Sequence, residues 1–106
     1  MIYTTTETIP GRDIIEIVGI VTGNVVQSKH IGRDIMAGLK SIVGGEIRGY
    51  TEMLSDARDV AIERLVASAA EKDADAIVGI RFTTSGIMDG SSEIMAFGTA
   101  VKLAPR

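Results

Sequence analysis

The chain has 106 residues, of which 45% are hydrophobic and only 4% aromatic. It carries 11 Lys and Arg against 14 Asp and Glu, for a formal net charge of −3, and it contains no Cys. Nucleic-acid binders carry basic surfaces, so this charge argues against a nucleic-acid partner, and the missing Cys excludes disulfides, thiolate nucleophiles and Cys-based metal sites.

The length is that of one domain, which we expect to span residues 1–106. No run reaches the roughly 18 apolar residues that a transmembrane helix needs. Residues 1–7 also lack the basic and apolar regions of a signal peptide. We therefore expect a cytoplasmic protein without a membrane partner.

Residues 13–21 predict a strand, because they are rich in β-branched residues whose apolar side chains fall on both alternating faces. Gly23-Asn24 predicts a turn or a bulge, after which the strand continues. A short helix is expected next and is ended by Gly44-Gly45. Its apolar residues recur at helical spacing, and they are Ile31, Ile35, Leu39 and Ile42.

The longest periodic segment predicts an amphipathic helix of about six turns. Thr51 is the expected N-cap, and the helix is expected to end near Lys72 or Asp73. The apolar side follows a 3.6-residue period through Tyr50, Leu54, Ala57, Ala61, Leu65 and Ser68.

Residues 76–85 and 93–103 predict two strands, joined by a hairpin because Asp89-Gly90 is a strong turn signal between β-rich runs. Alternation places Val78, Ile80 and Phe82 on one face of the first of these strands. The last strand carries a single charge, Lys102, which favours a central position in the sheet.

The element order strand-helix-helix-strand-strand predicts an α+β fold with two layers, in which one long and one short helix cover one face of an antiparallel-rich sheet. Two such helices leave the second face of the sheet uncovered, although the first strand is apolar on both faces. Large apolar patches on a protein usually mark interfaces. The sequence therefore predicts a homo-oligomer, with the second face packed against other copies.

No dedicated catalytic motif is present. Residues 38–41 lack the Gly-Lys-Ser/Thr of a phosphate loop, and residues 44–49 lack the dinucleotide fingerprint. His30, the one imidazole, is better explained as an exposed helix-cap residue than as part of a triad or an anion site. The four carboxylates on one side of the long helix are better explained as a salt-bridged, solvated face than as a cation site; they are Glu52, Asp56, Asp59 and Glu63, with Arg58 and Arg64 nearby. Met36, Met53 and Met95 are better explained as residues that fill the core or an interface than as metal ligands.

A set of short motifs runs along nearly the whole chain: Thr4-Thr5, Gly44-Gly45 before Tyr50, Ala57-Arg58 with Ala61, Ala74, residues 76–82 and Gly98-Thr99-Ala100-Val101. In these motifs the chain resembles the YbjQ-like family of bacterial proteins, which carries a heavy-metal-binding label. The resemblance implies a small α+β subunit, similar to dodecin-like folds, that assembles as a ring, and specifically as a homopentamer.

The chain has few of the side chains that a heavy-metal site needs, because soft metals prefer thiolates, imidazoles or clustered thioethers as ligands. The chain has no Cys and one His. In a ring, however, one residue near the symmetry axis is repeated in every subunit. A single His30 or Glu46 per chain would then become a ring of ligands.

The sequence thus favours a non-enzymatic, ring-forming protein that binds a small ligand or ion at the ring or at its subunit interfaces. We expect the ligand-binding residues to be Glu46, Tyr50 and Arg58, and we expect no catalytic residue. The sequence leaves the metal ligands and any cofactor open. One alternative is a metal-binding or metal-sequestering protein. Another is an enzyme at the subunit interface, with Glu46 as base, Tyr50 as hydrogen-bond donor and Arg58 as anion clamp.

Overall fold

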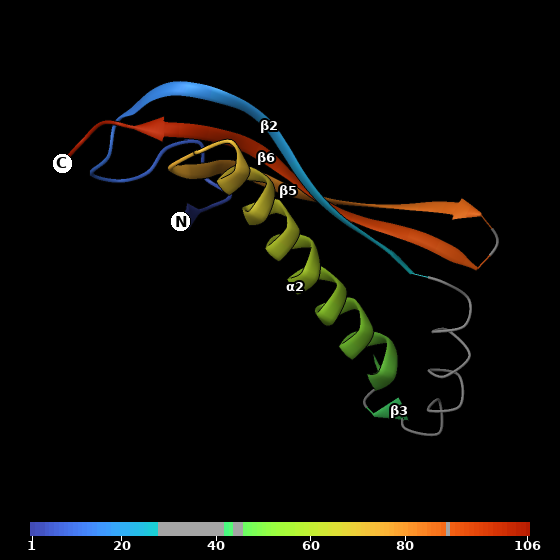
Figure 1. Ribbon diagram of the computed structural model, residues 1–106. Coiled ribbons are helices and arrows are strands. Elements are labelled where there is room, and N and C mark those ends of the chain that lie inside the picture. Colours follow the sequence, from blue (N-terminus) through green and yellow to red (C-terminus); the bar gives the residue numbers. More distant parts are fainter. Residues whose placement is uncertain (28–41, 44–45, 89) are drawn as a thin grey trace.

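The computed structural model describes residues 1–27, 42–43, 46–88 and 90–106. A four-stranded mixed sheet, in the order β1-β5-β6-β2, carries a long helix on one face (Figure 1). Strand β1 runs parallel to β5, and the other neighbours are antiparallel. The elements are β1 (Ile2–Tyr3), β2 (Ile14–Gln27), β3 (Ile42–Val43), β4 (Glu46–Ile47), α2 (Arg48–Glu71), β5 (Ala76–Met88) and β6 (Ser91–Leu103).

The α+β class is confirmed, but the expected order of elements needs correction. The sequence did not predict β1, nor the antiparallel pair of β3 and β4. The predicted short helix falls largely on residues 28–41, and these lie outside the described residues, as do Gly44 and Gly45. The last residue assigned to that helix, Ile42, lies in β3 and pairs with Ile47.

The two C-terminal strands form the expected hairpin, and β6 is central as its low charge predicted. Strand β5 ends at Met88 and β6 begins at Ser91, with Gly90 at a φ of 74° in the turn. Asp89 lies outside the described residues. The hairpin projects beyond the helix (Figure 1).

A β-bulge in β5 overturns the expected placement of side chains on its two faces. Gly79 has a φ of 64°, and the register with β6 shifts between Val78 and Arg81. The extra residue interrupts the alternation of side chains. Val78 therefore packs on the face away from α2, whereas Ile80 packs in the core beneath the helix.

The core beneath α2 is built from small helix residues and aliphatic strand residues. Of the predicted periodic face of the helix, Ala57, Ala61 and Leu65 are buried, whereas Leu54 and Ser68 are half-buried. Ala61 and Leu65, together with the buried Ala69, pack on strand residues of the sheet, among them Val21, Ile77, Ile80, Ala96 and Ala100. Because the helix residues are small, the backbones of α2 and β2 come close together, at Gly23 above all. Gly23 is therefore a contact point inside β2, and it does not form the expected turn or bulge.

The ends of α2 match the prediction at one terminus only. The helix begins at Arg48, so Thr51 lies within its first turn and is not the N-cap. At the other end the helix stops at Glu71, as expected. Asp73 takes a φ of 56°, and the Ala74 N–H donates to the Ala69 carbonyl oxygen at 3.1 Å, which is a helix C-terminal motif.

Within the described part of the chain, the second face of the sheet is covered at one end only. The segment before β2 crosses this face, and Ile9 packs there against Ala76, Val78, Val101 and Leu103. Further along β2 the apolar side chains stay exposed. In the described part of the chain, no helix is long and apolar enough to cross a membrane.

Candidate functional site

The three residues that were predicted to bind a ligand lie at two separate places along the molecule. Glu46 lies in β4, where it pairs with Val43. Strand β4 leads directly into α2, so Glu46 lies just before the helix and Tyr50 lies in its first turn. Arg58 is exposed and lies eight residues beyond Tyr50, which is about 12 Å along the helix axis. The three residues therefore do not form one compact cluster within a chain.

The charged face of α2 is solvated as expected. Glu52, Asp56, Asp59 and Glu63 are all exposed. Arg64 reaches the sheet, where its Nη1 donates a hydrogen bond to the carbonyl oxygen of Asn24. Among the residues that the structure describes, no group of three or more His, Cys, Asp or Glu is placed to hold a metal ion. His30 and Met36 lie outside that part of the chain.

The methionines that the structure describes in the sheet and helix do not form a thioether site either. Met53 is half-buried in α2, and its carbonyl oxygen accepts a hydrogen bond from Gln27 Nε2 at 3.4 Å. Met88 is exposed at the end of β5, opposite Ser91, whereas Met95 is four residues further along β6. Four strand residues span about 13 Å. The described donors of one chain thus do not fit a soft, heavy metal.

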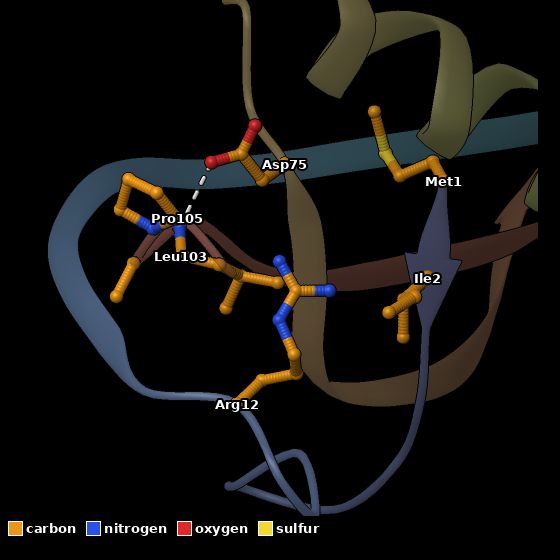
Figure 2. A pocket seen from close by; sticks show the side chains of 7 residues that line it. Met1, Ile2, Arg12, Asp75, Leu103 and Pro105 are labelled. Carbon is orange, nitrogen blue, oxygen red and sulfur yellow. Dashed lines mark hydrogen bonds between the residues drawn. The ribbon is translucent and has the colours of Figure 1, made fainter.

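A pocket of about 620 Å³ lies where the two ends of the chain meet β5, and we call it the corner pocket. Figure 2 shows Arg12 extending into it from the segment before β2, with Asp75 on the opposite side. Its other lining residues are Met1, Ile2, Leu103, Ala104 and Pro105. Its volume is in the range of small-molecule sites, about 300–1,000 Å³.

The charged groups of the corner pocket have different roles. The Asp75 carboxylate is engaged in the fold, because its Oδ2 accepts a hydrogen bond from the Leu103 N–H at 2.9 Å (Figure 2). Ala104 is fixed next to it, since its N–H donates to the Asp13 carbonyl oxygen at 2.8 Å. Arg12 is left as the group that could attract an anion. Sequence reasoning missed this pocket, because Arg12 and Asp75 belong to no motif and only the tertiary fold brings them together.

Strand β2 carries a series of exposed aliphatic side chains. It is 14 residues long and lies at the edge of the sheet, with β6 as its one neighbour among the described residues. Its exposed aliphatic side chains are Ile15 (63%), Ile17 (73%), Ile20 (78%) and Val26 (56%). A long apolar edge of this kind is a template for pairing with another chain unless it is protected.

Comparisons with known proteins agree on one family. A family model described as "Putative heavy-metal-binding" matches residues 1–104. A UPF0145 protein of Shewanella frigidimarina is 94% identical over 99% of this chain and 98% of its own length. A UPF0145 protein of Thermotoga maritima is 57% identical over 97% of each chain.

A solved structure supports the fold independently. It is a crystal structure of a protein of unknown function from the DUF74 family of Pediococcus pentosaceus. The superposition covers 98% of this chain and 98% of that one, with a TM-score of 0.66 and a sequence identity of 18%. At that identity the likeness concerns the fold alone. The family model and the close relatives lead to one conclusion: the chain belongs to the YbjQ family, whose model carries the description "Putative heavy-metal-binding".

Proposed function

We propose that this protein is a non-enzymatic, cytoplasmic homo-oligomer that forms a ring and binds a small ligand or ion at the ring or at its subunit interfaces. The observation that carries the proposal is the exposed aliphatic surface of β2. Ile17 and Ile20 lie on an edge strand, about three-quarters exposed. Burial of each such side chain is worth about 1.5–3 kcal/mol, so the surface strongly favours association.

The extent of the surface supports the same proposal. The chain exposes 6956 Å², whereas a compact monomer of 11.2 kDa exposes about 5,700 Å². The excess is larger than the roughly 800 Å² per partner that a standard interface buries. The radius of gyration is 17.0 Å, against about 13 Å for a compact domain of this length.

The positions of the apolar residues favour a ring over a two-fold dimer. One exposed set lies on β2, and a second lies on the β5 hairpin arm, where Phe82, Ile87 and Met88 are exposed. Strands β2 and β5 are separated by β6, so the two sets of exposed side chains lie toward opposite edges of the sheet. Two different patches that bind each other give a head-to-tail interface, which forms a ring where the rotation between neighbouring subunits closes and a filament where it does not. The homopentamer of dodecin-like subunits implied by the sequence resemblance is the form that we propose.

Native mass spectrometry tests the assembly. The wild-type protein is expected at five times the chain mass, and Ile20→Lys is expected to shift it to smaller species because the charge would be buried in the interface. Ala67→Lys adds the same charge at an exposed position on α2 and is expected to leave the assembly intact. A wild-type protein that remains monomeric at micromolar concentration overturns the proposal.

A metal-binding protein is the second candidate, and the description of the family model is what favours it. The described residues of one chain do not supply the ligands, so a site would have to be formed by symmetry from His30 or Glu46. Elemental analysis after incubation with Zn²⁺ or Cu²⁺ and desalting tests it. Stoichiometric metal that is lost in His30→Ala or Glu46→Ala supports this candidate, and metal-free protein contradicts it.

A further inference from the structure

A second cavity, of about 410 Å³, lies beside residues 4–9 where they cross the face of the sheet opposite α2. We call it the loop pocket. We propose that it binds a small molecule with an apolar body and a single carboxylate, which Arg81 holds. The inference deepens the proposed function, on which it rests, by naming the class of ligand and its place in the subunit.

The wall of the loop pocket is fixed by backbone hydrogen bonds across the bulge in β5. The Thr4 N–H donates to the Ile77 carbonyl oxygen at 3.0 Å, and the Ile80 N–H donates to the Thr4 carbonyl oxygen at 3.1 Å. Between them, the Gly79 N–H donates to the Thr6 carbonyl oxygen at 2.9 Å. The wall is therefore part of the folded structure, and the pocket is formed before any ligand arrives.

The bulge also decides where Arg81 lies. In an unbroken strand Arg81 would share the helix face with Ile77, because alternate residues share a face. The extra residue at Gly79 moves Arg81 to the face of Val78, where it lines the pocket. Its Nη1 donates to the carbonyl oxygens of Thr5 and Ile80, both at 2.8 Å.

These two hydrogen bonds orient the guanidinium without using all of it. Arginine has five N–H donors, of which Nη1 carries two. The Nε and Nη2 groups keep three donors in the planar arrangement that matches a carboxylate. Arg81 is thus a positioned cation, and its anchoring lowers the entropy that is lost when it binds an anion.

The floor of the loop pocket is apolar and is formed by the aliphatic residues Ile14, Ile17, Val78 and Val101. Val78 and Val101 are buried in the protein, whereas Ile17 is largely exposed and would gain cover from a ligand. Thr99 adds one hydroxyl to the lining. Glu7 also lines the pocket, and its negative charge opposes every anion but opposes ligands with two or more negative charges, such as phosphates, more strongly than a monocarboxylate. Together these groups select an apolar monocarboxylate.

Calorimetric titration with octanoate, with octanol as the neutral analogue, tests the proposal on the full-length protein. Octanoate is expected to bind, and octanol to bind at least tenfold more weakly. Arg81→Gln is expected to weaken octanoate binding by about ten- to hundredfold, as the loss of a charge-assisted pair predicts. Lys72→Gln removes one positive charge at an exposed position at the end of α2 and is expected to bind octanoate like the wild type.

A second variant separates binding from folding. Thr99→Ile keeps a β-branched residue in β6 but fills part of the cavity, so it is expected to weaken octanoate and octanol alike. If Arg81→Gln does not fold, this variant decides. Absence of octanoate binding to the wild type overturns the inference, and so does octanoate binding by folded Arg81→Gln or Thr99→Ile that equals that of the wild type.

Native mass spectrometry of the same samples separates this inference from the proposed assembly. A ring that does not bind octanoate contradicts the loop pocket and leaves the assembly standing. A monomer that binds octanoate through Arg81 contradicts the assembly and leaves the loop pocket standing.

Discussion

At Gly23 the backbones of β2 and α2 meet without room for a side chain. A Cβ atom at this position would overlap the Ala61 carbonyl oxygen and the Leu65 backbone nitrogen. Both are backbone atoms of the helix, so neither can move aside as a flexible side chain can. We predict that Gly23→Ala lowers the free energy of unfolding by about 3 kcal/mol, the upper part of the usual range for overpacking.

Urea denaturation measures this effect, and Gly86→Ala is the matched control. Gly86 also lies in a strand, but a Cβ atom there meets nothing within 4 Å. Its substitution is expected to leave the unfolding free energy unchanged or to raise it by about 0.5 kcal/mol, because alanine restricts the unfolded chain. Equal midpoints for Gly23→Ala and the wild type would show that helix and strand are not in backbone contact at this point.

Among the elements, the bulge in β5 has the largest structural consequence. It places Val78 and Ile80 on opposite faces, and it directs Arg81 to the face that carries the loop pocket. The bulge depends on Gly79, whose φ of 64° is in the left-handed region. Most other residues are strained in that region by about 1–2 kcal/mol, whereas Asn tolerates it better.

We therefore predict that Gly79→Ala lowers the unfolding free energy by about 1–2 kcal/mol, although the space around the Cβ position is open. Gly79→Asn is expected to cost less than alanine, despite its larger side chain, because the strain is in the backbone and not in packing. Urea denaturation of both variants distinguishes the two causes. An asparagine variant that is clearly less stable than the alanine variant contradicts the backbone explanation.

The elements that could be predicted from the sequence are those with a local signal. The buried face of α2 follows from helical periodicity, and the β5–β6 hairpin follows from its Asp-Gly turn. By contrast, Gly79 looks the same in a sequence whether a strand is regular or bulged. Strand β1 has two residues, and it exists only because β5, far along the chain, pairs with it.

The candidate sites were harder to predict for the same reason. Arg81 gains its role from carbonyl oxygens of the N-terminal segment, and Arg12 and Asp75 meet only in the folded molecule. Glu46, Tyr50 and Arg58 were predicted to bind one ligand, but Glu46 lies in a strand, and Arg58 is more than two turns of α2 from Tyr50. Sequence spacing identifies a site when its residues share one element, and here they come from several.

For the whole molecule, two strands carry most of the exposed apolar side chains that the structure describes. One set lies on β2 and the other on the hairpin arm, toward opposite edges of the sheet. Burial of these residues by other copies would make folding and association a single process. The stability of such a protein depends on its concentration, because the associated state is favoured by mass action.

This dependence gives a prediction for thermal unfolding. If five chains unfold and separate together, a hundredfold rise in protein concentration adds about 2 kcal/mol of stability per chain, which raises Tm on the order of 10 °C for a chain of this length. Ile20→Lys is expected to lower Tm and to remove most of its concentration dependence, because the exposed isoleucine lies on the edge strand. Ala67→Lys, on the solvated side of α2, is expected to keep it. A wild-type Tm that stays constant over this range, measured by scanning calorimetry, would mean that the exposed strand is not buried by other copies.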